Sequence, residues 1–152
     1  FTLSVSQYRD FQKRLEPCGT VLVPVPQNLV DQIRLQPHWA EIDPLPQVGH
    51  SNVFSLTPDQ TGETVEQKLQ RVREKLEKKN AQLLPVTKLD QIAWLLNLRG
   101  TDIPYNPVFI AYAIVTPEQA FLFTNLDRIE PSVRQSLEPG LTLLPYERYH
   151  AT

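Results

Sequence analysis

The sequence predicts an α/β fold, a mixed β-sheet flanked by helices and preceded by a proline-rich linker. Two observations lead to this fold class. Between residues 64 and 146, segments of helical periodicity alternate with short runs of β-branched and aromatic residues, in the order α-β-α-β-β-α-β. The composition, 41% hydrophobic and 21% charged over 152 residues, is that of an ordinary globular chain.

The N-terminal part predicts two helices and a strand. A helix is expected over residues 4–16, where Ser4 or Ser6 can serve as N-cap and apolar residues recur at helical spacing. The β-branched run at 20–25 predicts a strand, and residues 28–34 can form one or two helical turns.

Residues 36–58 predict an extended linker. They contain four prolines and little regular periodicity, which favours a semi-rigid segment lying across a surface. We expect a domain boundary near residue 55, and we expect His38 and Trp39 to anchor the linker against a neighbouring element.

The second unit begins with the clearest helix, at 64–80. Thr64 and Gln67 form a capping box, and Asn80 can adopt the left-handed conformation at the C-terminal end. A single apolar stripe faces the core, and the interleaved charges on the other face predict a solvated surface; the stripe is Val65, Leu69, Val72 and Leu76.

The next elements are a strand at 82–87 and a short apolar helix at 88–96, for which Thr87 and Asp90 predict a second capping box. Because this helix is apolar over most of its circumference, it is expected to be largely buried. Residues 97–107 predict a loop.

The C-terminal part predicts a hairpin, a helix and a last strand. Strands are expected over 108–116 and 120–125, joined by a turn at 117–119. A helix follows at 131–140, and the final strand at 141–146.

No complete catalytic or metal-binding set can be assembled from sequence patterns. The five glycines form no phosphate-binding loop, no two of the three histidines have the i, i+4 spacing of metal-binding helices, and Cys18 is the only cysteine. A pair of catalytic carboxylates is defined by spatial separation, so the sequence leaves it open. The net charge of −2 and the lack of an apolar run of about 18 residues favour neither nucleic acid nor membrane as a partner.

One loop carries a group of polar and amphipathic residues, namely Arg99, Asp102, Tyr105 and Asn106. Loops at the ends of strands are where binding residues concentrate, so these four are candidates for a binding site. The structural alternative is that Arg99 and Asp102 pair with each other and that Asn106 caps a turn before Pro107.

The run TKLDQIAWLLNLRGTDIPYNPVFIAYAIVT, residues 87–116, resembles the middle domain of three-domain Xaa-Pro aminopeptidases of the creatinase/prolidase group. NLVDQI at 28–33, followed by prolines, resembles the end of that family's first domain. The resemblance assigns 1–35 to the end of a first creatinase-like domain and 59–152 to a middle domain that is incomplete at its C-terminus. Arg34 departs from the tryptophan usual in the family, and Pro85 from a β-branched position.

The resemblance implies a parent metallopeptidase that removes an N-terminal residue preceding proline. In that family a C-terminal pita-bread domain binds two metal ions, usually manganese, and none of its ligand motifs matches this chain. The chain is therefore expected to lack catalytic residues, to pack on the catalytic domain, to shape peptide access and to contribute to a homodimer, in the cytoplasm. Because the corresponding loop lies near the substrate cleft in the family, residues 99–106 become substrate-cleft candidates.

Two other classes of function stay open from the sequence. One is a free-standing, non-enzymatic α/β interaction module. The other is an independent hydrolase, which predicts metal-dependent turnover by this chain alone; we expect that no such turnover will be found.

Overall fold

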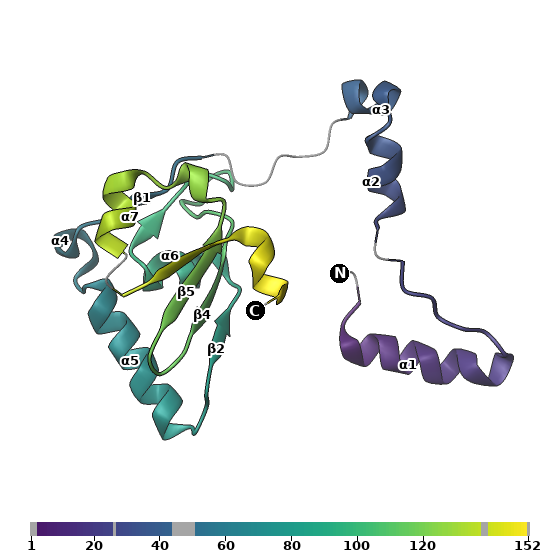
Figure 1. The fold of residues 1–152 in the computed structure, drawn as a ribbon, viewed down its shortest axis with the longest axis horizontal. Coiled ribbons are helices and arrows are strands. Elements are labelled where there is room, and N and C mark those ends of the chain that lie inside the picture. The colour runs from purple at the N-terminus through teal and green to yellow at the C-terminus, as the bar shows by residue number, and fades with distance from the viewer. Residues whose placement is uncertain (1–2, 26, 44–50, 138–139, 152) are drawn as a thin grey trace. The chain divides into compact units, whose positions relative to one another are not determined.

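The computed structural model describes residues 3–25, 27–43, 51–137 and 140–151. The chain divides into two compact units, Phe1–Pro46 and Gln47–Thr152, whose elements are labelled in Figure 1. Among the described residues, no helix combines the length and the apolar character needed to span a membrane.

The first unit begins with the predicted helix, α1 (Val5–Leu15). Ser4 is its N-cap and forms a capping box with Gln7: the Gln7 amide donates to Ser4 Oγ at 3.3 Å, and the Ser4 amide donates to Gln7 Oε1 at 2.8 Å. The 3₁₀ turn η1 (Glu16–Cys18) follows and ends at Gly19, whose φ of 66° is left-handed.

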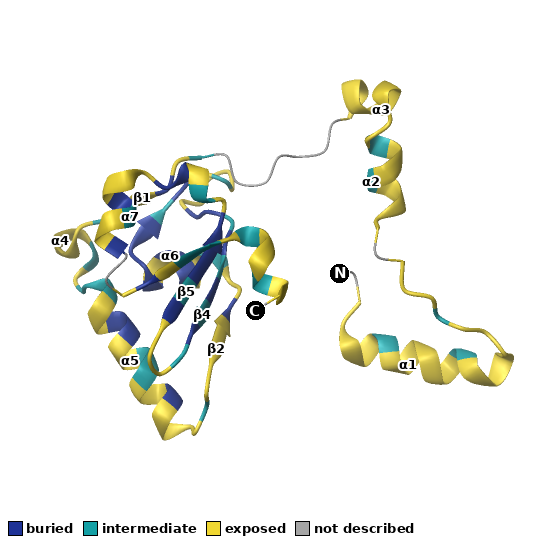
Figure 2. Cartoon of the chain, viewed as in Figure 1, coloured by how far each residue is buried: buried dark blue, intermediate teal, exposed yellow. Residues whose placement is uncertain are grey.

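The rest of this unit differs in part from expectation. Residues 20–25 form no strand, although α2 (Leu29–Arg34) is present with Asn28 as its N-cap. A short helix that the periodicity did not predict, α3 (Pro37–Ile42), follows. No described residue of this unit is buried, as the absence of dark blue in this part of Figure 2 shows. A strand needs a neighbouring strand for its backbone groups, and the described part of the unit supplies none.

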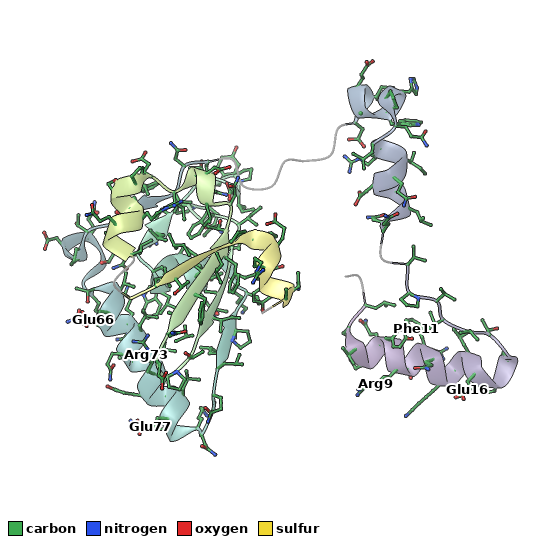
Figure 3. All side chains as sticks on the ribbon, in the orientation of Figure 1. Arg9, Phe11, Glu16, Glu66, Arg73 and Glu77 are labelled. Carbon is green, nitrogen blue, oxygen red and sulfur yellow. The ribbon has the colours of Figure 1, made fainter. Side chains whose placement is uncertain are left out.

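The second unit contains the predicted long helix, α5 (Val65–Lys78), preceded by the single turn α4 (Pro58–Thr61). The capping box of α5 is confirmed, since Thr64 Oγ1 accepts from the Gln67 amide at 3.2 Å. Asn80 has a φ of 50°, which confirms its left-handed conformation. Figure 3 labels three polar side chains along α5, namely Glu66, Arg73 and Glu77.

Four short strands of the described part form one mixed sheet in the order β2-β4-β5-β6. The strands β2, β4 and β5 are antiparallel neighbours, whereas β6 runs parallel to β5. Their bounds are Leu84–Val86, Tyr112–Val115, Ala120–Thr124 and Thr142–Pro145. The predicted hairpin is therefore confirmed as β4–β5, with β4 beginning later than the pattern suggested.

The core lies between one face of this sheet and the helices α5, α6 (Leu89–Leu95) and α7 (Pro131–Leu137). Sheet residues such as Ala113 and Leu122 are buried in it. The opposite face carries Tyr112 and Phe123, which are register partners. The turn η3 (Tyr146–Ala151) packs aromatic rings against this second face.

Two local predictions around α6 are wrong. Its N-cap is Lys88, which makes no side-chain capping bond, so the expected capping box of Thr87 and Asp90 does not form. The helix is less enclosed than its composition suggested, because Trp94 is 44% exposed.

An additional two-stranded ladder lies beside α6. The strand β1 (Phe54–Ser55) pairs antiparallel with β3 (Leu98–Arg99). It brings residues from the region predicted as linker next to the start of the polar loop.

Candidate functional site

A buried ion pair lies beneath the polar loop. Arg128, in the 3₁₀ turn η2 (Leu126–Arg128), donates through Nη2 to Asp102 Oδ1 at 2.9 Å. Its Nη1 lies 2.8 Å from Asp102 Oδ2, an ion-pair contact without hydrogen-bond alignment. The two side chains are only 3% and 2% exposed, so each charge depends on the other for its stability in the interior.

Ser51 joins the ion pair to the chain that enters the second unit. Its Oγ donates to Asp102 Oδ1 at 2.9 Å and accepts from the Thr101 amide at 2.8 Å and from Arg128 Nη2 at 3.1 Å. The Ile110 amide donates to Asp102 Oδ2 at 2.7 Å. The carboxylate therefore fixes three separate segments: the start of the unit, the polar loop and η2.

Gly100 allows these segments to approach closely. A Cβ at this position would lie 2.7 Å from Phe109 Cβ and 3.1 Å from Ser51 Oγ. The first contact is shorter than a packed interior tolerates, and Phe109 is itself completely buried. Position 100, within the loop, is thus restricted to glycine by packing.

The cluster favours the ionised form of Asp102. Burial by itself raises the pKa of the carboxyl group, but the hydrogen bonds from Arg128, the Ile110 amide and Ser51, together with the positive charge of Arg128, outweigh it. The net effect is a lowered pKa. At neutral pH the site is a locked ion pair rather than an acid or base available for chemistry.

The predicted pairing of Arg99 with Asp102 is wrong. Nη1 of Arg99 instead donates to the carbonyl oxygens of Ala93 at 2.7 Å and Leu98 at 2.8 Å. Asn106 closes a turn as expected, although it does so through its backbone amide, which donates to the Ile103 carbonyl at 3.1 Å.

The four sequence-predicted residues are therefore not brought together. Asp102 is an internal anchor, Arg99 satisfies carbonyl groups around the end of α6, and Tyr105 and Asn106 stand exposed at the tip. Ser51 and Arg128 were missed because they lie 51 and 26 residues from Asp102, and no local pattern encodes such distant pairing.

A second polar cluster surrounds Lys68 of α5, which is 1% exposed. Its Nζ donates to the Trp94 carbonyl at 2.9 Å and to Asn97 Oδ1 at 2.6 Å, and it lies 4.6 Å from the centre of the Trp94 ring. Burial lowers the pKa of Lys68, with smaller lowering contributions from Arg99 and Arg71 and an opposing one from Glu63. These contacts link α5 to the end of α6.

A hollow of about 590 Å³ lies at the ends of β5 and β6. Tyr146, one of the residues that line it, is next to Tyr112, which stacks on Tyr149 with ring centres 4.0 Å apart. Burial and a hydrogen bond with Tyr112 raise the pKa of Tyr146 to about 12, so this phenol is neutral at physiological pH. The lining is Ile110, Thr124, Asn125, Leu126, Asp127, Arg128, Pro145, Tyr146 and Glu147.

The described residues do not fit a metal centre. Within the described ranges, no three histidine, cysteine, aspartate or glutamate side chains are grouped so that they could hold a metal ion. The buried carboxylate of Asp102 already has its oxygens occupied by Arg128, Ser51 and the Ile110 amide.

Comparison with known proteins defines the family. The family model of the creatinase/prolidase N-terminal domain matches residues 44–152. The chain belongs to this family. The match confirms the resemblance carried by residues 87–116, and the mixed sheet flanked by helices confirms the predicted fold class.

Proteins similar to the chain include fungal proteins described as probable Xaa-Pro aminopeptidase P. The Aspergillus fumigatus protein is 39% identical over 150 residues, which cover 98% of this chain and 22% of that protein. The Laccaria bicolor protein is 40% identical over 146 residues, which cover 95% of this chain and 21% of that protein. The chain thus spans about a fifth of the length of these relatives.

A solved structure of the same kind is also similar. The X-prolyl aminopeptidase of Caenorhabditis elegans, described as a cytosolic enzyme with a di-nuclear active site, matches with a TM-score of 0.79 at 30% identity. The match covers 97% of this chain and 23% of the nematode enzyme.

Proposed function

We propose that this chain is the non-catalytic N-terminal and middle region of a longer, metal-dependent Xaa-Pro aminopeptidase, which releases an N-terminal residue preceding proline. The observation that carries the proposal is one of coverage. Nearly the whole chain matches about a fifth of relatives described as probable Xaa-Pro aminopeptidases, and the matching family is an N-terminal domain. In this proposal, residues 1–35 end a first domain and 59–152 form most of a middle domain. The linker predicted over 36–58 ends earlier than predicted, because β1 (Phe54–Ser55) pairs with β3 inside the second unit.

The chemistry would lie in a C-terminal pita-bread domain that holds two manganese ions. The di-nuclear active site of the nematode relative supports this arrangement. Because the described residues of this chain offer no metal-binding group, no catalytic step is assigned to them. A cytoplasmic location is part of the proposal and is supported by the cytosolic description of the same relative.

The proposed role of the chain is to pack on the catalytic domain, to shape peptide access and to contribute to a homodimer. The Asp102–Arg128 pair supports the access role because it holds the 99–106 loop at a fixed position. A loop that is fixed before binding loses little entropy when a peptide or a neighbouring domain contacts it. Arg99 and Asn106 are then the candidates for contact with the peptide, with Asp102 as their support, and Tyr105 lies beside them on the same loop.

The test is to assay the longer protein, and this chain separately, on Xaa-Pro peptides with and without Mn²⁺. We expect manganese-dependent cleavage by the longer protein and no turnover by this chain. A coding sequence that stops at Thr152 would instead favour the free-standing interaction module, and sedimentation of the longer protein tests the homodimer.

The access role is tested by Arg99→Ala in the longer protein. We expect a higher KM or a lower kcat, by roughly 10-fold for a well-placed contact. Arg9→Ala is the matched control, because Arg9 lies exposed on α1 (Figure 3). Unchanged kinetics in Arg99→Ala, with thermal unfolding like the wild type, would contradict the role.

A further inference from the structure

The tip of the polar loop is a tight turn that places a tyrosine where glycine is usual. The Asn106 amide donates to the Ile103 carbonyl at 3.1 Å, and these two residues form an antiparallel bridge. Pro104 occupies the second position of the turn, and Tyr105 occupies the third with a φ of 62°. This is the pattern of a type II turn, whose third residue needs a positive φ.

The conformation of Tyr105 is unfavourable for the isolated chain. A left-handed backbone disfavours a non-glycine residue by roughly tenfold in the folding equilibrium. Tyr105 is fully exposed, and within the described residues its side chain makes no hydrogen bond or ring contact that would offset this cost. Glycine or asparagine would suit this backbone better, so the folding of the described unit does not explain why a tyrosine occupies this position.

The turn is nevertheless held rigidly. Asp102, one residue before it, is locked by Arg128, and its amide donates to the Val108 carbonyl at 3.2 Å. The Val108 amide in turn donates to the Asn106 carbonyl at 2.8 Å. A rigid base that presents one exposed aromatic ring has the form of a preorganised contact residue.

We propose that Tyr105 is an anchor side chain that docks into an apolar pocket of the catalytic domain of the same polypeptide. The inference rests on the proposed function, because that domain lies in the part of the relatives, close to four fifths of their length, that this chain does not match. The tip favours such a pocket over a charged surface: Ile103–Ile110 contains no charged residue, and Ile103, two residues before Tyr105, is 37% exposed. Tyrosine is among the residues most enriched at the energetic centres of interfaces.

The test uses the longer protein as wild type, Tyr105→Gly, Tyr105→Asn and Tyr105→Phe. Glycine and asparagine accept the left-handed backbone and remove the ring, whereas phenylalanine keeps both the ring and the strain. Amide hydrogen exchange is measured in segments outside residues 1–152. We expect one such segment to exchange at least about 10-fold faster in the glycine and asparagine variants, and within about threefold of wild type in the phenylalanine variant.

Three results would overturn the anchor. The first is equal exchange outside residues 1–152 in the wild type and the glycine variant. The second is a raised KM for Xaa-Pro peptides with unchanged exchange, which would assign Tyr105 to the peptide. The third is a loss of protection that depends on protein concentration, which would assign it to a second copy.

Cleavage by the wild type reports separately on the proposed function. If the wild type is inactive but exchange is faster in the glycine variant, the proposed function is refuted and the proposal that Tyr105 is an anchor is supported. If the wild type is active but exchange is unaltered in the glycine variant, the proposed function is supported and the proposal that Tyr105 is an anchor is refuted.

Discussion

Asp102→Asn tests the physical account of the site most directly. The substitution keeps the shape of the side chain and removes its charge, so Arg128 loses its ionic partner at a position where its side chain is 3% exposed. Ser51 Oγ, at 3.1 Å, would remain as an acceptor for Nη2, but it carries no charge. Nε of Arg128 has no acceptor among the described residues even in the wild type.

The expected loss is large. Removing one partner of a buried ion pair costs about 3–5 kcal/mol, because the remaining charge stays desolvated. Typical domains unfold with about 5–15 kcal/mol, so the variant would lose a large share of its stability. Replacing both residues, as in Asp102→Leu with Arg128→Met, should cost less than Asp102→Asn alone, since no buried charge is then left unpaired.

The assay is urea unfolding in a Trp39→Phe background, so that Trp94 in the second unit is the fluorescent reporter. Glu77→Gln, on the exposed face of α5, is the matched control and should change the unfolding free energy by no more than about 0.5 kcal/mol. A decrease below about 1 kcal/mol in Asp102→Asn would refute the reasoning.

The same variant gives a pH dependence. Because the folded-state pKa of Asp102 is lowered, its stabilisation is fully present above the ordinary carboxyl pKa of about 4 and is lost as the pH falls through the lowered value. The unfolding free energies of wild type and Asp102→Asn should therefore converge in acid. A constant difference from neutral to strongly acidic pH would contradict the assignment.

Three further predictions concern other parts of the second unit. Gly100→Ala should destabilise it by about 1–3 kcal/mol in urea unfolding, because the new Cβ meets Phe109 at 2.7 Å; an unchanged midpoint would show that the segment can relax. Burial lowers the pKa of Lys68, so between the folded-state pKa and 10.5 only the unfolded state keeps the proton. The free energy of unfolding of the wild type should therefore rise relative to that of Lys68→Met as the pH increases through this window. Parallel pH profiles of the two proteins would contradict this. In ultraviolet titration of the folded protein, one of the five tyrosines should ionise at about 12, and this step should disappear in Tyr146→Phe but not in Tyr8→Phe.

Local patterns predicted much of the fold. The helix α1 begins after Ser4, one of the two expected N-caps, and α5 begins where a capping box was expected, because a cap joins groups only two or three residues apart. The hairpin β4–β5 was predicted for a similar reason, since its turn joins strands that are adjacent in the chain. The cap of α6 was wrong because its first residue is Leu89, one position later than a cap at Thr87 would set.

Tertiary structure decided what the site residues do. The composition of residues 99–106 indicated a candidate binding loop. Arg99 and Asp102, although close in sequence, nevertheless bind different partners. The partner of Asp102 comes from η2, and its position depends on how β5 leads into that turn. No spacing rule links residues 26 positions apart in irregular segments.

By itself, the sequence determined the fold class, the positions of most helices and strands, and the family to which residues 44–152 belong, because these follow from local periodicity and from a long specific motif. Only the tertiary structure decided that Asp102 is an internal anchor and Tyr105 an exposed and strained tip. The physical reason is that burial and ion pairing depend on which segments, distant in sequence, come into contact, and these contacts form only when the chain folds.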